Sequence, residues 1–279
     1  MSQARKSRTE AGEDQRPSPP IVTLLSDFGG KDGFVGILKG VVLGICPQAR
    51  LVDLSHEITP QGVIEGALVL AAAVDHFPAG TVHLAVVDPG VGTARRPLLI
   101  ETDTFSLVGP DNGLLSLAAE RSTVRRVVHL DRPEWFAKAV SATFQGRDVF
   151  APIAARRASG IPAEKLGETI AEFARLELPQ ARRVDDGLEG QIIYVDRFGN
   201  LICNVQPQDV ETFREKALSI SIGGVQLFEV SPSYASVREG RPVAVWNSWG
   251  RLEVAIRNGS AARQLRVRDG DRVQVKLRR

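Results

Sequence analysis

Residues 81–96 read TVHLAVVDPGVGTARR. The run Val82–Val87 is apolar and rich in β-branched residues, and it stops at Asp88 in the turn sequence DPG. This pattern predicts a buried strand followed by a tight turn, because proline cannot donate to a sheet and glycine accepts positive φ. Asp88 then lies at the carboxyl end of a strand, where open α/β sheets bind ligands, and Arg95 follows in the same loop. Taken alone, the segment is equally typical of a structural turn with a surface Asp–Arg pair.

Strands and helices alternate on both sides of this segment. This alternation predicts an α/β domain over residues 21–180, with a mostly parallel sheet and flanking helices. Apolar residues recur at helical spacing in Asp32–Ile45, and Thr59 followed by proline is a plausible helix start. The expected strands are Ile21–Leu25, Arg50–Leu54, Leu98–Glu101, Thr104–Val108 and Val124–Leu130, and the expected helices are Asp32–Ile45, 59–76 and Val149–Ala158.

The pattern changes after a polar, proline-containing linker near residues 176–179. Short strands at hairpin spacing then predict a smaller all-β domain over residues 188–279, with one short helix at 207–216. We expect residues 1–20 to form a disordered tail, because they are polar and contain no apolar stretch. The expected strands of the second domain are 190–195, 201–205, 218–222, 225–230, 242–246, 251–257 and 272–277.

The composition favours a small-molecule partner. Lys and Arg number 35 against 33 Asp and Glu, so no large net charge attracts nucleic acid or a membrane surface. No apolar run reaches the 18 or so residues of a membrane span. The cysteines Cys46 and Cys203 lie far apart, which argues against a disulfide framework and fits a reducing cytoplasm. The four histidines lack metal-ligand spacing, so we expect no transition metal.

Three further turns carry polar residues that could bind a ligand. Asp27 follows the first strand in SDFGG, which is neither a dinucleotide nor a Walker motif, so its carboxylate suits a diol or an amine better than a phosphate. The turns 196–200 (DRFGN) and 246–250 (WNSWG) have residues that hairpins also favour for backbone reasons alone. Residues 141–148 (SATFQGRD) precede a helix, where they indicate either a polar pocket or an ordinary N-cap with a first-turn aspartate.

Together these segments resemble one family, the S-adenosylmethionine hydroxide adenosyltransferases, which are related to fluorinase and chlorinase. The resemblance runs from about residue 21 to 277 and rests on six motifs in order: SDFG, DPGVGT-x-RR, PDNG, TFxGRDxFAP, VDxFGNxxxN and NSxGRLxxAxxNGSAA. It implies attack of water on the 5′ carbon of S-adenosyl-L-methionine, giving adenosine and L-methionine. S-adenosyl-L-methionine is then the substrate, with no separate cofactor and no metal. The resemblance also implies a homotrimer whose pocket lies between the N-terminal domain of one subunit and the C-terminal domain of the next.

The resemblance also implies a role for each motif residue. Asp27 would accept both ribose hydroxyls, since a carboxylate offers two oxygens to a cis-diol. Asp196 would bind the ammonium of the methionine part and Ser248 its carboxylate. Asn200 would read an adenine edge, and Tyr234 would stack on adenine.

The water-positioning group of the hydrolases is expected at Asp88, Arg95 and Gln145. The family has a histidine at position 145, and glutamine can orient water but cannot take its proton, so we expect slower turnover. Asp88 could still act as the base, although the adjacent Arg95 weakens it. The halogenases carry tyrosine at position 88 and arginine at Trp249. Retention of Asp88 favours water over halide; a halide adenosyltransferase and a non-catalytic S-adenosylmethionine-binding or adenosine-binding protein remain the alternatives.

Overall fold

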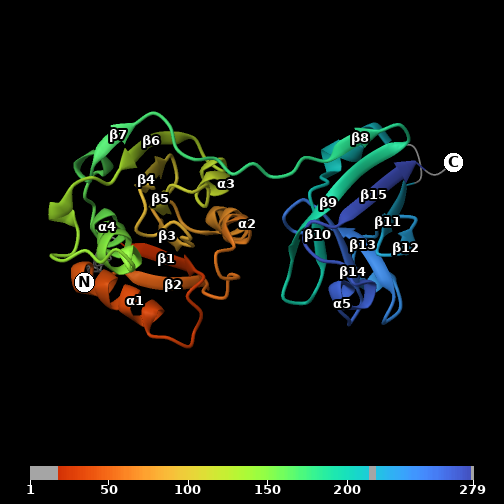
Figure 1. Ribbon diagram of the computed structural model, residues 1–279, viewed down its shortest axis with the longest axis horizontal. Helices are drawn as coiled ribbons and strands as arrows, with labels where there is room; N and C mark the ends of the chain where they lie inside the picture. The colour runs from red at the N-terminus through yellow and green to blue at the C-terminus, as the bar shows by residue number, and fades with distance from the viewer. Residues whose placement is uncertain (1–17, 214–217, 278–279) are drawn as a thin grey trace, which may run out of the picture.

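The computed structural model describes residues 18–213 and 218–277. They form an N-terminal α/β region and a C-terminal β region, joined by an extended segment between β7 and β8 (Figure 1). The predicted tail lies outside the described residues except for its last three positions, residues 18–20. No helix within the described residues is long and apolar enough to cross a membrane.

The N-terminal region is built on a seven-stranded sheet with the order β2-β1-β3-β5-β4-β6-β7. The first four strands in this order are parallel, whereas β4 runs antiparallel to both of its neighbours and β7 runs antiparallel to β6. The predicted mostly parallel sheet is therefore confirmed. The strands are β1 (Ile21–Ser26), β2 (Arg50–Ser55), β3 (Val82–Val86), β4 (Pro97–Thr102), β5 (Ser106–Pro110), β6 (Val124–His129) and β7 (Glu168–Ile170).

Helices cover both faces of this sheet, as Figure 1 shows. One buried cluster joins side chains of α1 and α4 to the sheet, and a second joins α2 and α3 to the opposite face. Alternate residues of each strand enter different clusters; Leu24 belongs to the first and Leu25 to the second, because successive side chains point to opposite faces. The helices are α1 (Phe34–Ile45), α2 (Val63–Ala73), α3 (Ser116–Ala119) and α4 (Ala151–Ala158).

The C-terminal region is an antiparallel sheet around its own apolar core, with α5 packed at one end (Figure 1). Its strand order is β12-β11-β15-β9-β10-β14-β13, and β8 adds to β9. This confirms the predicted all-β character. The elements are β8 (Arg182–Val184), β9 (Gly187–Val195), β10 (Leu201–Cys203), β11 (Leu218–Ile222), β12 (Val225–Leu227), β13 (Pro242–Trp246), β14 (Leu252–Ile256), α5 (Ala261–Leu265) and β15 (Arg272–Leu277).

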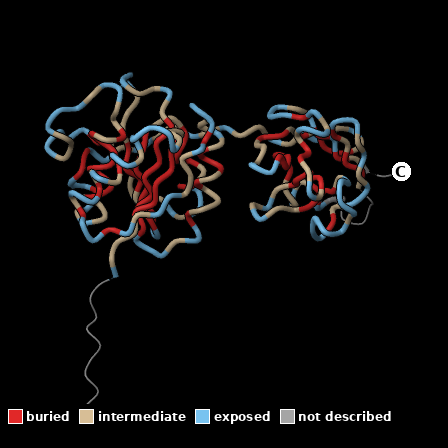
Figure 2. Tube along the Cα trace, turned by 90° about the horizontal axis from the view of Figure 1, so that it is seen from below, coloured by how far each residue is buried: buried red, intermediate tan, exposed pale blue. Residues whose placement is uncertain are grey.

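A small apolar cluster connects the two regions. Leu68 of α2 packs with Ile193 and Ile202 of the C-terminal sheet, and Trp249 lies against the same cluster. Figure 2 shows buried residues concentrated within each region and an extended connection between the two.

Several element boundaries differ from the sequence predictions. Helix α2 begins at Val63 and its N-cap is Gly62, so Thr59 is not the cap. Instead, the Thr59 carbonyl accepts the Gly62 N–H at 2.7 Å, and the Thr59 N–H donates to Glu65 at 3.1 Å. The prediction of Thr59 as cap was wrong because a tight turn precedes the helix. The short elements β7, β8, α3 and α5 were not predicted, since three to five residues carry too little periodicity.

Candidate active site

Two carboxylates follow the neighbouring strands β1 and β3 of the N-terminal sheet. Asp27 comes directly after β1, and Asp88 follows β3, with Ser26 and Val86 paired in the sheet register. The β2-β1-β3 order makes the gap between β1 and β3 the point where successive connections leave for opposite faces. Ligands of open α/β sheets bind at such points.

Asp88 and Arg95 form a buried, multiply bonded pair. Arg95 Nε donates to both Asp88 oxygens at 3.0 Å, and its Nη2 also donates to Oδ2. The side chains are only 6% and 9% exposed, so this is not the surface pair of the alternative reading. Arg95 Nη2 also donates to Gln145 Oε1. The structure thus joins the three residues that the sequence assigned to water positioning.

Close backbone approach brings the Asp88 loop to the Gln145 loop. Gly92 has φ +79°, and a Cβ at this position would lie 2.8 Å from the Ala142 carbonyl oxygen. Only glycine meets both conditions without displacement of one loop. The Arg95 guanidinium lies 5.2 Å from the centre of the Phe150 ring, a cation–π contact that holds it from the other side.

Gln145 immediately precedes a π-helical turn, Gly146–Phe150, which continues into α4. Such turns are rare and often occur at functional sites. Asp148 in this turn is buried and accepts the Ser141 N–H at 2.8 Å and two bonds from Arg147. The hydrogen bond from Arg147 lowers the pKa of Asp148. Asp148 therefore holds the loop that carries Gln145, in place of the N-cap that the sequence left open.

Asp27 is held by the loop between β2 and α2. The Gln61 N–H donates to Asp27 Oδ2 at 2.8 Å, and Gln61 has φ 67°, an unusual conformation for a residue with a side chain. On the other side of Asp27, Phe28 packs with Phe34 and Phe144 at ring-centre distances of 5.8 and 5.9 Å. The Asp27 turn is thereby linked to the segment that carries Gln145.

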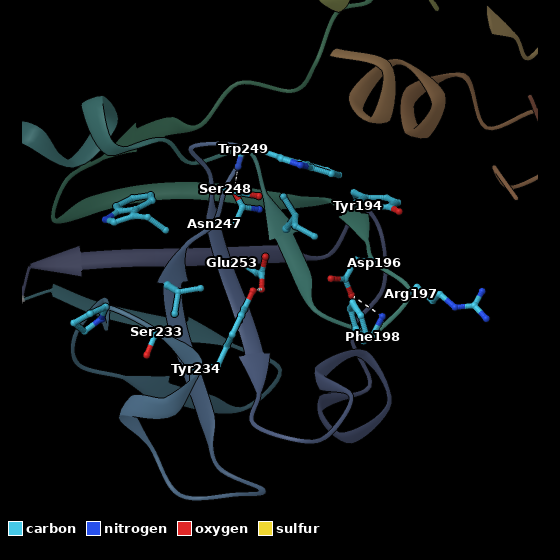
Figure 3. Close-up of a pocket in the computed structure, with 14 residues that line it drawn as sticks. Tyr194, Asp196, Arg197, Phe198, Ser233, Tyr234, Asn247, Ser248, Trp249 and Glu253 are labelled. Carbon is cyan, nitrogen blue, oxygen red and sulfur yellow. Dashed lines mark hydrogen bonds between the residues drawn. The ribbon is translucent and has the colours of Figure 1, made fainter. Parts of the chain in front are cut away.

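Three of the four remaining predicted residues line a cavity of about 590 Å³ in the C-terminal region (Figure 3). Asp196, Ser248 and Tyr234 line it, but Asn200 does not. The cavity is strongly aromatic: its walls include both tyrosines and two of the three tryptophans of the chain. Aromatic walls suit the flat face of a base and the charge of a cation.

Asp196 and Asn200 form one closed turn. Asp196 Oδ1 accepts the N–H groups of Phe198 and Asn200 at 2.9 and 2.8 Å, and Asn200 Nδ2 donates to Oδ2 at 2.9 Å. Gly199 must be glycine here, with φ +83° and only 2.0 Å between a Cβ and the Ser260 hydroxyl oxygen. Phe198 is 76% exposed at this cavity, a contact residue that sequence reasoning missed although it lies inside the quoted motif.

Tyr234 is tethered by a buried carboxyl group. Its hydroxyl donates to Glu253 Oε1 at 2.7 Å, and Glu253 is only 3% exposed. Burial raises the pKa values of both groups. The sequence analysis missed Glu253, although a single carboxylate within the apolar strand β14 was an available signal.

Ser248 and Trp249 occupy the turn between β13 and β14. Asn247 Oδ1 accepts the Trp249 and Arg251 N–H groups, both at 3.0 Å, which fixes the turn. The Trp249 ring stacks on Tyr194 with centres 5.5 Å apart and planes at 20° (Figure 3). Tyr194 is a further wall residue that the sequence analysis did not identify.

The predicted site is therefore divided between two surfaces. All residues that line the cavity in Figure 3 lie between positions 194 and 253, whereas Asp27, Asp88, Arg95 and Gln145 belong to the N-terminal sheet and its loops. A separate group at the sheet edge, His129, Asp131 and Glu168, has potential metal-ligand atoms within 4.8 Å of one another. Asp131 already accepts the Glu168 N–H at 3.1 Å, and these strands carry none of the candidate site residues.

Comparison with known proteins identifies similar chains over almost the whole length. Family models described as the SAM hydroxide adenosyltransferase N-terminal and C-terminal domains match residues 22–167 and 190–274. A "(R)-S-adenosyl-L-methionine hydrolase" of Thermus thermophilus is 40% identical, with 91% of this chain and 98% of the relative covered. The protein of the same name from Salinispora tropica is 38% identical, with 92% and 97% covered.

More distant and structural relatives agree with these matches. A fluorinase of Nocardia brasiliensis is 30% identical, with 92% of this chain and 97% of the relative covered. A crystal structure of an uncharacterized conserved protein from Thermotoga maritima superposes with a TM-score of 0.84 at 32% identity, covering 91% of this chain and 99% of that one.

Proposed function

Because the chain belongs to the SAM hydroxide adenosyltransferase family, we propose that it hydrolyses S-adenosyl-L-methionine to adenosine and L-methionine. The names of its 38–40% identical relatives support this reading over a halogenase. The observation that carries it is the bonded group Asp88, Arg95 and Gln145 beyond the carboxyl end of β3. It is a polar, buried group that can hold one water molecule in a fixed position.

The reaction needs little beyond positioning. A lone pair of water forms the C5′–O bond while the C5′–S bond breaks, and the electron pair of that bond stays on sulfur as the neutral thioether of methionine. One water proton must leave, and we assign its acceptance to Asp88. Since the sulfonium is already a good leaving group, we assign no metal or cofactor to the step. Exclusion of bulk water strengthens every polar contact to the reacting atoms.

Gln145 is assigned the orientation of the water. Its Oε1 accepts from Arg95, so its Nε2 amide is turned the other way and can donate to a water oxygen. It cannot remove a proton, which leaves Asp88 as the base. We therefore propose a slow hydrolase.

The substrate contacts follow from the two surfaces. Asp27 is assigned the ribose hydroxyls, and the aromatic cavity with Asp196, Ser248 and Tyr234 is assigned the base and the methionine part. Asn200 is buried, and its amide nitrogen already donates to Asp196. We therefore assign only its side-chain oxygen to a hydrogen bond with adenine.

We further propose a homotrimer in which these two surfaces meet across a subunit boundary. Ile37 and Leu43 on α1 are 43% and 41% exposed, which leaves an apolar helix face without cover in the single chain. Three glycines of α1, at positions 36, 40 and 44, have no neighbouring atom within 4 Å of a built Cβ, so another subunit could approach closely. Apolar faces of this kind are typical of subunit interfaces.

The test is chromatography of the protein incubated with S-adenosyl-L-methionine, with and without chloride, beside an Asp88→Ala variant. We expect adenosine and methionine in equal amounts, lost in the variant and unaffected by chloride. A 5′-chloro nucleoside would instead identify a halide adenosyltransferase. Intact substrate, together with tight binding in calorimetry, would identify a binding protein that holds S-adenosylmethionine without turnover.

A further inference from the structure

A chain of hydrogen bonds runs from β2 and the β2–α2 loop to Ser26, the last residue of β1, which directly precedes Asp27. Ser26 Oγ lies 2.7 Å from His56 Nδ1, and His56 Nε2 lies 3.0 Å from Asp53 Oδ1. Lys39 completes the chain by donating to Asp53 Oδ2 at 2.6 Å. None of these residues is assigned a role in the proposed reaction.

The partners determine the direction of each bond. A carboxylate only accepts, so His56 Nε2 carries a proton, and in the neutral ring Nδ1 accepts from the Ser26 hydroxyl. The Ser26 oxygen then accepts the Phe28 N–H at 3.3 Å. Because the Asp53 carboxylate fixes the tautomer, the His56 ring is oriented to hold Ser26.

The residue types suggest a hydrolytic triad, but the burial excludes it. Ser26 is 0% exposed, so no substrate can reach its hydroxyl. The exposed end of the chain is Asp53, whose side chain is 43% exposed, while that of His56 is 11% exposed. The hydrogen-bond chain therefore holds the backbone around Ser26 in place. The residue after Ser26 is Asp27.

The backbone of the same loop makes two more bonds to the Asp27 turn. The His56 carbonyl accepts the Gly29 N–H at 2.7 Å. Five residues further on, Gln61 donates its N–H to Asp27 Oδ2 and adopts φ 67° to do so. Residues in such conformations persist where surrounding contacts hold them, and they cluster at functional sites. The turn 26–30 is thus held from both ends by one loop.

We propose that His56 is a positioning residue for Asp27. It ties the turn 26–30 to the β2–α2 loop through its ring and its carbonyl, and so fixes the carboxylate that binds the ribose hydroxyls. This inference rests on the proposed role of Asp27. It assigns to His56 no contact with substrate and no proton transfer.

The test measures adenosine affinity by calorimetry in the full chain for wild type, His56→Ala, Asp27→Ala and the double variant. Asp27→Ala removes charged hydrogen bonds to the ribose, which typically costs about tenfold or more in affinity. His56→Ala leaves this carboxylate in place but unheld, so we expect a loss of up to the same size. Since His56 acts through Asp27, the double variant should bind no more weakly than Asp27→Ala alone. In the hydrolysis assay, His56→Ala should raise KM by a similar factor and leave kcat within about threefold, because ribose binding is common to ground and transition states.

If His56→Ala fails to fold, Ser26→Ala is a milder variant, because it removes only the hydroxyl that donates to the His56 ring. His56→Asn should partly rescue affinity, because its amide oxygen can accept from Ser26. The matched control is His76→Ala, which removes an exposed histidine outside the loop.

Two results would overturn the proposal: unchanged adenosine affinity in both His56→Ala and Ser26→Ala, or an equal further loss when His56→Ala is added to Asp27→Ala. The adenosine affinities test the role of His56 even if the protein binds nucleosides without hydrolysing S-adenosyl-L-methionine, whereas the hydrolysis assay would not.

Discussion

Gln145 is the residue on which the proposed rate depends. It accepts from the same Arg95 nitrogen that donates to Asp88, and this hydrogen bond fixes its position in the site. Its amide, however, cannot take a proton from water. An amide orients water, whereas an imidazole can also share its proton at neutral pH.

Gln145→His should therefore raise kcat by about a hundredfold or more, the usual contribution of a general base. The measurement is single-turnover hydrolysis followed by chromatography from pH 5 to 9. A new limb near the pKa of a histidine should accompany the gain. Gln145→Asn, which shortens the side chain away from Arg95, is the control and should be slower than wild type. An unchanged kcat in Gln145→His would mean that proton removal does not limit the reaction.

His83 is a second residue whose surroundings make a measurable prediction. It is fully buried in β3, its Nδ1 lies 2.8 Å from the Thr23 hydroxyl oxygen, and Phe77 and Phe105 pack edge-on against its ring. Its Nε2 has no hydrogen-bond partner among the described residues. Burial lowers its pKa to about 4.

The free energy of unfolding should consequently fall as the pH drops from 6.5 to 4. In this window the unfolded chain binds a proton at residue 83 that the folded chain does not, and the loss can reach about 3 kcal/mol. The leucine of His83→Leu cannot titrate, so the unfolding free energy of this variant should depend less on pH. Urea unfolding at pH 4, 5, 6 and 7 should show up to one proton fewer taken up on unfolding than in wild type. Equal slopes for the variant and wild type would contradict this account.

At the scale of elements, the site depends on how closely loops approach one another. The Asp88 loop meets the Gln145 loop where Gly92 faces the Ala142 carbonyl, and the Asp196 turn meets α5 where Gly199 faces Ser260. Both glycines combine positive φ with a contact that a Cβ would block. The loops hold the candidate site residues in place because their backbones pack directly together.

Gly92→Ala should lower stability by about 1–3 kcal/mol and reduce kcat more than it raises KM, since it displaces Arg95 and Gln145 from each other. Gly80→Ala is a matched control: Gly80 has φ +86° but no atom within 4 Å of a built Cβ. It carries the conformational cost alone and should retain activity. Thermal unfolding and steady-state kinetics of the two variants separate the cost of a positive φ from the effect of the Cβ contact with Ala142. Equal kinetic effects would show that the Gly92 contact does not position the site.

At the scale of the whole molecule, neither of the two surfaces carries all the candidate site residues. The aromatic cavity carries the residues proposed to bind substrate, and the N-terminal sheet carries the group proposed to position water. The proposed trimer brings these surfaces together between neighbouring subunits.

Mixing inactive variants tests this arrangement. Asp88→Ala and Asp196→Asn should each lose most activity as homotrimers. Co-expressed in equal amounts, they should recover about one quarter of wild-type activity, because one in four random neighbour pairs combines two intact surfaces. Recovery should require mixed trimers, so mixing the purified proteins without subunit exchange is the control. No recovery in mixed trimers would place the whole site within one chain.

The sequence by itself determined the fold class and the family. Apolar runs ended by DPG and SDFG reveal strands with ligand-facing ends, because local chain preferences and side-chain periodicity are written in neighbouring residues. The same local information placed Asp27 and Asp88 at strand ends and Arg95 in the loop after Asp88, and the motif order made candidates of Gln145 and the residues of the C-terminal turns.

Only the tertiary structure decided which of these residues meet. The contact between Arg95 and Gln145 joins residues 50 positions apart, and the bond between Tyr234 and Glu253 depends on strand pairing. The roles of His56 and Gln61 were invisible in the sequence for the same reason: each acts on a turn some 30 residues away. Hydrogen bonds and close packing over such separations depend on how the strands are ordered in the sheet, which no local pattern encodes.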